Sequence, residues 1–207
     1  MTHYAVLVIY EGDISNAEDK VDGLLDKYNV DKHRTQKTIA WTKKSIEEFR
    51  PTVMEQLNGM TEEEAMNHSI RFFRNLYPKK AEVTNMSHEE YVKLAYGLEL
   101  DEEGNAIDYT NPNAKYDWYE IGGSFKGWFT LKKDKSKSVD MAYSKDIDWE
   151  ATTKPFEDHK FSTPVVCTQD GWFDEKSERE NWKSGYYDRF LRDLPDNAVL
   201  VIVDCHM

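Results

Sequence analysis

The C-terminal residues Asp204, Cys205 and His206 bring a carboxylate, a thiol and an imidazole into three consecutive positions. Cys205 could act as a nucleophile assisted by His206 or Asp204, which is the chemistry of a small hydrolase. Side chains alternate between faces along a strand, however, so Cys205 and His206 cannot pair directly. The same alternation puts Asp204 and His206 on one face, where His3 joins them only if the register allows. The alternative is an ordinary strand end with a small buried thiol.

Residues 111–129 form a second candidate site, because six aromatic rings and three glycines fall within nineteen residues. Rings could stack on a planar ligand, while glycine amides and a lysine could bind its anionic group. The residues in question are Trp118, Tyr119, Gly122, Gly123, Ser124 and Lys126. In the alternative interpretation the rings fill a core, and the Gly-Gly pair is the two-residue turn of a hairpin between 116–121 and 124–129. We favour this core hairpin, with a few ring faces exposed.

Other chemical signatures are missing from the sequence. It has no HxxH, HExxH or CxxC pattern, so a metal site would have to assemble from distant residues. It also has no phosphate-binding loop, GxSxG motif or dinucleotide fingerprint. The sequence therefore predicts no metal and no cofactor, and it favours a protein that is not an enzyme.

The composition is that of a folded, strongly acidic protein. Hydrophobic residues make up 39% of the 207 positions and aromatic residues 13%, more than a disordered chain contains. The formal net charge of −12 disfavours direct binding of nucleic acid, whose affinity depends on neutralising phosphates. Such a charge is typical of a highly soluble cytosolic protein, or of a protein whose acidic face mimics nucleic acid. The N-terminal apolar run is too short for a signal peptide or a membrane span, so we expect a cytoplasmic protein with free thiols.

Two apolar runs predict the centre of the fold. Residues 5–9 and 198–203 are apolar at consecutive positions, as in strands that are covered on both faces. We therefore expect both terminal strands in one sheet, within a single α+β domain over 1–207. The sheet is mixed and packed by helices.

Helical patterns occupy much of the first half of the chain. We predict helices over 15–28, with Ser15 as the N-cap, and over 35–49, ended by Pro51. Capping boxes at Thr61 and Ser87 open two further helices. These patterns predict that the block over about 35–100 is a helical insertion or lid. Strands follow from about residue 105, and a last helix covers about 175–193.

Three segments resemble a family of uncharacterised bacteriophage and prophage proteins. Residues 111–123 match the family segment NPxAKWDWYxIGGRW, residues 6–9 match its opening VLVI strand, and residues 194–197 and 203–207 match its closing LPDDTLLxxVDCHI. The resemblance implies a phage or prophage source and names no activity. Ser124 and Phe125 stand where the family has arginine and tryptophan, which weakens a catalytic role for this segment.

These features favour a phage accessory protein that acts by binding, in host takeover or counter-defence, for example as an anti-CRISPR inhibitor. It would either sequester a nucleotide-like signalling molecule or block a host defence protein. The alternatives are a small hydrolase that uses the Asp-Cys-His residues and a virion structural or assembly factor. We expect no membrane association, and a homo-oligomer stays open.

Overall fold

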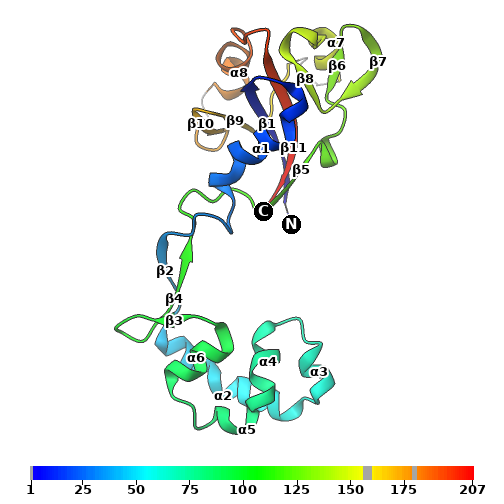
Figure 1. Cartoon of the computed structure of the whole chain (residues 1–207). Helices are drawn as coiled ribbons and strands as arrows, with labels where there is room; N and C mark the ends of the chain where they lie inside the picture. The colour runs from blue at the N-terminus through cyan, green and yellow to red at the C-terminus, as the bar shows by residue number, and fades with distance from the viewer. Residues whose placement is uncertain (1, 156–159, 179–180) are drawn as a thin grey trace. The chain divides into compact units, whose positions relative to one another are not determined.

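The computed structural model describes residues 2–155, 160–178 and 181–207. The chain divides into two compact units. Unit 1 consists of Met1–His33 and Asn113–Met207, and unit 2 consists of Arg34–Pro112. Unit 2 thus interrupts unit 1 in the sequence, and the helical block predicted over about 35–100 falls within unit 2 (Figure 1). In the ranges described, no helix is both long enough and apolar enough to cross a membrane.

A mixed sheet built on the two terminal strands is the centre of unit 1 (Figure 1). β1 (His3–Glu11) and β11 (Ala198–His206) pair antiparallel along their whole length, whereas β9 runs parallel to β1. The strand order is β10-β9-β1-β11-β5. β5 pairs with the C-terminal half of β11, and β8 pairs with its N-terminal half. The other strands of the sheet are β5 (Trp118–Ile121), β8 (Met141–Tyr143), β9 (Val165–Thr168) and β10 (Gly171–Asp174). The predicted α+β class and the shared sheet of the terminal strands are confirmed.

Helices cover both faces of this sheet, which explains why its central strands are apolar at consecutive positions over 5–9 and 198–203. On one face, Val6 and Val201 share a core with α1 (Ala17–Leu25). On the other face, Leu7 and Leu200 share a core with α8 (Trp182–Phe190). We call these the α1 face and the α8 face.

The helices α1 and α8 of unit 1 differ in detail from the predicted ranges. The predicted helix over 15–28 consists of a 3₁₀ turn at Ile14–Asn16, α1, and a second turn, η2, at Asp26–Tyr28. The cap is Asp13, whose side chain accepts from the backbone N–H of Ser15. The helix predicted over 175–193 runs only from Trp182 to Phe190, after a turn at 175–177, and positions 179–180 lie outside the described residues.

A small β-layer completes unit 1. β6 (Phe129–Leu131) and β7 (Asp134–Val139) pair with each other in a two-stranded sheet. A 3₁₀ turn, Ser144–Asp146, and the short helix α7 (Trp149–Thr153) follow. Phe129 is fully buried in the core of the α8 face, so this layer extends that core.

Unit 2 combines short helices with a three-stranded sheet of order β2-β4-β3. The capping boxes of Thr61 with Glu64 and of Ser87 with Glu90 are both formed, as predicted. Its elements are β2 (Gln36–Trp41), α2 (Lys43–Gly59), α3 (Glu62–Met66), α4 (Arg71–Leu76), η3 (Tyr77–Lys79), α5 (Lys80–Val83), α6 (His88–Tyr96), β3 (Glu99–Leu100) and β4 (Ala106–Thr110).

The helix predicted over 35–49 is wrong at both ends. Gln36–Trp41 is a strand that pairs with β4, so the helix starts only after its N-cap, Thr42. It then continues through Pro51 to Gly59. Proline removes one helical hydrogen bond, but buried residues on both sides of it, Ile46 and Val53, belong to one core and hold the helix together.

Candidate functional site

The polar residues of the two terminal strands meet at one end of the sheet. The register of β1 and β11 makes His3 the Cα partner of His206. Thr2 and Met207, one pair further out, exchange two backbone hydrogen bonds of 2.9 and 3.1 Å. His3 and His206 are therefore a pair without mutual backbone bonds, the position at which side chains on antiparallel strands approach most closely.

His3, Asp204 and His206 gather on the α8 face as a compact group, which we call the His-Asp-His cluster. The rings of His3 and His206 lie 3.9 Å apart between centroids. The Nδ1 atom of His3 lies 3.0 Å from Oδ2 of Asp204, and Nε2 of His206 lies 4.0 Å from the same oxygen. The carboxylate–imidazole pair predicted from strand alternation is thus present, and the register adds the second imidazole.

Asp204 is held in place from the segment after β5. The backbone N–H of Ser124 donates to Oδ2 of Asp204 at 2.8 Å, and the Ser124 hydroxyl lies 3.4 Å from Nδ1 of His3. Burial raises the pKa of the Asp204 carboxyl, but the hydrogen bonds from Ser124 and His3 lower it by more. The pKa therefore lies below its usual value and the carboxylate form is favoured.

The Gly122-Gly123 pair does not form the predicted hairpin turn. β5 pairs with β11, whereas β6, the expected partner of β5, pairs with β7 in a different sheet. Both glycines have positive φ, +74° and +49°, and they lead into a 3₁₀ turn, η4 (Gly123–Phe125). A Cβ on Gly123 would lie 2.4 Å from Cβ of Asp204. The close approach of β11 therefore requires a glycine here, and the glycine pair from which a hairpin turn was predicted serves this contact instead.

The backbone amides of Gly122 and Ser124 in this turn already have partners within the chain. One of the two sequence-based interpretations of this segment had the amides of Gly122 and Gly123 binding an external anion. Instead, the N–H of Gly122 donates to the carbonyl of Ile202 at 2.8 Å, and the next amide after the pair, that of Ser124, donates to Asp204. Lys126 is exposed beyond the turn. The carboxylate in this turn is thus one of the chain's own.

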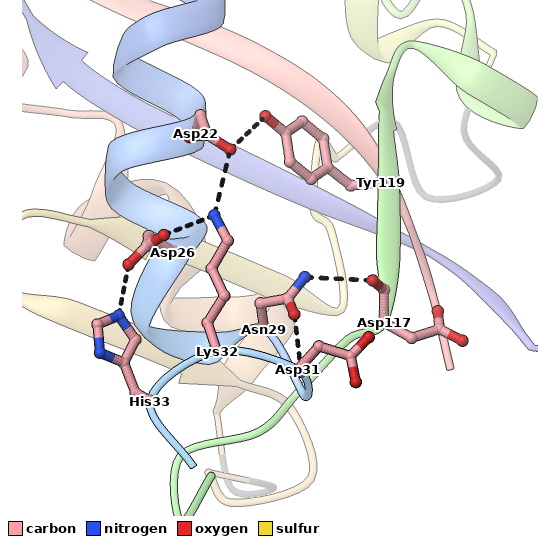
Figure 2. A network of polar contacts seen from close by, with 8 residues as sticks. All are labelled: Asp22, Asp26, Asn29, Asp31, Lys32, His33, Asp117 and Tyr119. Atoms are coloured by element: carbon pink, nitrogen blue, oxygen red, sulfur yellow. Dashed lines mark hydrogen bonds and ion pairs between the residues drawn. The ribbon is translucent and has the colours of Figure 1, made fainter.

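The two aromatic candidates of β5 lie on opposite faces. Trp118 is 53% exposed, and its ring meets His206 edge-on with 4.4 Å between centroids. Tyr119 points to the α1 face, where its ring packs against Tyr116. Its hydroxyl lies 3.4 Å from a carboxylate oxygen of Asp22 (Figure 2). The two rings therefore cannot form one stacking platform.

The network in Figure 2 explains the position of Tyr119. Lys32 lies between the carboxylates of Asp22 and Asp26, and Asn29 donates to the carbonyl of Asp117 at 3.2 Å. These contacts join the end of α1 to the start of β5. Tyr119 is thus part of the packing between these elements.

Cys205 is separated from the residues beside it in the sequence. Its side chain is fully buried on the α1 face, in the core that includes Val203. Burial is the main cause that raises the pKa of the Cys205 thiol, and it also raises the pKa of Cys167 to about 12. A buried thiol that holds its proton is a poor nucleophile. The structure therefore brings Asp204 and His206 together and leaves Cys205 on the other face.

A pocket of about 780 Å³ opens on the α1 face at the same end of the sheet. We call it the strand-end pocket. Its lining comes from five segments of unit 1: Thr2, Tyr4, Ala114, Lys115, Pro164, Val165, Trp172, Asp174, Glu175, Lys176, Ser177 and Met207.

Aromatic rings and charged groups share this pocket. The rings of Tyr4 and Trp172 are 6.5 Å apart in an edge-on arrangement, and the Tyr4 hydroxyl donates to the carbonyl of Lys115 at 2.6 Å. The Nζ atom of Lys115 lies 3.7 Å from Oδ2 of Asp174. The other carboxylate oxygen of Asp174, Oδ1, accepts hydrogen bonds from the hydroxyl and the N–H of Ser177. Fixed rings and oriented charges thus face one cavity.

Comparison of the chain with models of protein families, with curated proteins and with solved structures finds no match. Function is therefore inferred from the two faces at this strand end. Asp204 and His206 were predicted from the sequence as a pair on one face, and His3 was predicted to join them if the register allowed it. Tyr4, Lys115 and Trp172 were not predicted, because the pocket exists only after five segments of the chain come together.

Proposed function

We propose that the protein acts by binding and sequestering a small planar molecule of the nucleotide class in the strand-end pocket. The observation that supports this most directly is a cavity of about 780 Å³ lined by two aromatic rings and two lysines. Ligand binding was also predicted from the sequence, but at Trp118 and Tyr119. The aromatic residues of the proposed site are instead Tyr4 and Trp172.

The size and the rings of the pocket suit a heteroaromatic ligand. Pockets for small molecules are typically roughly 300–1,000 Å³, apolar in the main, with a few polar groups that fix orientation. Tyr4 and Trp172 offer ring surface, and Val165 with Pro164 adds aliphatic surface beside them. The Trp172 ring is backed by Tyr28, with 5.0 Å between centroids, so that it is held in place before a ligand arrives. A planar base would bury its faces against these groups.

The charged groups suit the polar parts of a nucleotide. Lys115 and Lys176 supply positive charge for a phosphate, in a chain whose net charge is −12. Asp174 and Glu175 supply acceptors for amino groups on a base. A phosphate that reaches Lys115 would share it with Asp174, so we expect the base contacts to contribute more to specificity than the phosphate contacts.

Sequestration is favoured over blocking of a host protein because the pocket is a specific site, whereas the acidic charge belongs to the whole chain. In the phage setting that the sequence resemblance implies, removal of a nucleotide signal would serve counter-defence. This setting is part of the proposal and depends on the resemblance.

Thermal unfolding with a panel of mononucleotides, cyclic nucleotides and dinucleotides tests the proposal. A ligand present at about 100 times its dissociation constant stabilises the folded state by about 2.7 kcal/mol, which gives a measurable rise in melting temperature. We expect a rise for at least one member of the panel, together with quenching of tryptophan fluorescence.

Two tryptophan variants locate the binding. Trp172→Ala should lose the ligand response, whereas Trp118→Ala, the matched control on the α8 face, should keep it. Lys176→Glu tests the pocket without touching the core, because Lys176 is exposed, and it should weaken binding of phosphorylated ligands most. No response to any nucleotide, or loss of the response in Trp118→Ala alone, would refute the proposal.

A further inference from the structure

The His-Asp-His cluster offers the donor atoms of a metal site on the face opposite the strand-end pocket. We propose that His3, Asp204 and His206 bind one divalent transition-metal ion, with Zn²⁺ as the best-suited ion. No residue of this cluster lines the strand-end pocket, so the inference does not depend on the proposed function.

The donor set supports this assignment. Two imidazole nitrogens and one carboxylate oxygen suit zinc and similar first-row metals, and zinc sites with three protein ligands keep a further position for water. Calcium and magnesium prefer sites made of oxygen ligands, which this cluster does not provide. The three side chains each present a ligand atom within 4.8 Å of the others.

The distances between the donor atoms are close to those of a metal site. Ligand atoms around a tetrahedral zinc ion lie roughly 3.3 Å apart, given bonds of about 2.0–2.1 Å. Nδ1 of His3 and Oδ2 of Asp204 are 3.0 Å apart, and Nε2 of His206 is 4.0 Å from that oxygen. Rotation of the imidazole rings can supply the remaining adjustment, since His3 and His206 are fixed opposite each other by the backbone.

The neighbouring groups orient the carboxylate and add negative charge. The Ser124 N–H holds Asp204 from outside the cluster, as the hydrogen-bond donors around metal ligands commonly do. Glu120 on β5 is the Cα partner of Asp204, so it adds a second acidic residue on the same face. The negative charges of Asp204 and Glu120 favour a cation at this position.

The cluster is also open on one side. The Asp204 side chain is 3% exposed and that of His206 is 9% exposed, whereas that of His3 is 42% exposed. An ion can therefore enter beside His3, and water can complete its coordination there. The hydroxyl of Ser124, 3.4 Å from Nδ1 of His3, borders the same opening.

Titration of the untagged, metal-free full chain with Zn²⁺ in a calorimeter tests the proposal, and Co²⁺ gives a second readout through its visible absorption. A histidine tag must be absent because it would bind both ions. We expect one Zn²⁺ per chain and a Co²⁺ spectrum of a four- or five-coordinate site. Saturating Zn²⁺ should also raise the melting temperature.

Three variants make the test specific to the cluster. His3→Ala and His206→Ala should each weaken Zn²⁺ binding at least tenfold and abolish the Co²⁺ spectrum. The matched control is His33→Ala, because His33 is an exposed histidine that contacts a carboxylate, Asp26, outside the cluster. This control should bind Zn²⁺ with unchanged affinity.

His206 is buried, so His206→Ala can fail to fold. In that case His3→Ala alone carries the test, because the exposed side chain of His3 can be removed without disturbing the core. Absence of Zn²⁺ binding by the wild-type chain would overturn the proposal. Equal Zn²⁺ affinity in His3→Ala and the wild type would overturn it as well, and so would loss of binding in His33→Ala only.

Discussion

The two faces of the β1–β11 pair differ sharply at the end where both strands terminate. On the α8 face, His3, Asp204 and His206 form a small polar group. On the α1 face, Tyr4 and Cys205 are Cα partners, with Tyr4 lining a pocket of about 780 Å³. Neighbours in the sequence thus take part in different sites because side chains alternate along a strand.

The comparison shows how a short stretch of sequence can carry two kinds of chemistry. The polar face is fixed by a glycine turn that brings the Ser124 amide onto Asp204. The aromatic face is fixed by ring contacts such as that of Trp172 with Tyr28. A slip of one residue in the register would exchange the two sets of side chains, so the pairing of β1 with β11 determines both sites.

The largest expected effect on stability comes from a substitution in the core beneath the β1–β11 pair, which positions both sites. Leu200 is fully buried in β11 on the α8 face, away from the strand end. Leu200→Ala should lower the free energy of unfolding by about 2–5 kcal/mol, because it removes buried surface and leaves a cavity. Urea unfolding followed by fluorescence measures the change. A loss below about 1 kcal/mol would contradict the packing described for this strand.

A smaller effect should separate the two faces. In Gly123→Ala the added Cβ would collide with Asp204, and the residue would keep an unfavourable φ of +49°. We expect a loss of about 1–3 kcal/mol and weaker Zn²⁺ binding, with nucleotide binding retained. The control is Gly185→Ala in α8, where a Cβ meets nothing within 4 Å. If Gly123→Ala impaired the pocket as strongly as the cluster, the two faces would not be independent.

The smallest effect is expected at Cys205, which lies between two residues of the cluster in the sequence. Cys205→Ala should reduce stability by about 1 kcal/mol through lost packing, and it should leave Zn²⁺ affinity unchanged. In the native wild type, a thiol reagent should react slowly with both cysteines and rapidly after denaturation, since both are buried. Fast native labelling of Cys205 would revive the hypothesis of a hydrolase with a cysteine nucleophile.

The features predicted correctly from the sequence were those with a local physical cause. Continuous apolar runs identified the two central strands, and the Thr61 and Ser87 capping boxes identified two helix starts. The shared face of Asp204 and His206 followed from strand alternation alone. Each of these depends on residues that are close in the sequence.

The features that were missed, or predicted only on a condition, depend on pairing between distant segments. Gly122-Gly123 fits a hairpin turn, but pairing of β5 with β11 placed these glycines against Asp204 instead. The inclusion of His3 required the register of strands about 200 residues apart, which the sequence does not encode locally. Trp172 joined Tyr4 only through the parallel pairing of β9 with β1 and the hairpin of β9 with β10.

The segments through which the chain leaves unit 1 and returns to it are hydrogen-bonded to each other. The N–H of Val30 donates to the carbonyl of Tyr116 at 2.9 Å, and that of Lys115 donates to the carbonyl of Tyr28 at 2.8 Å. Unit 1 is therefore closed by its own hydrogen bonds before and after the excursion through Arg34–Pro112. In terms of connectivity, unit 2 is an insertion in a loop of unit 1, and a short linker from His33 to Asn113 would be enough to replace it.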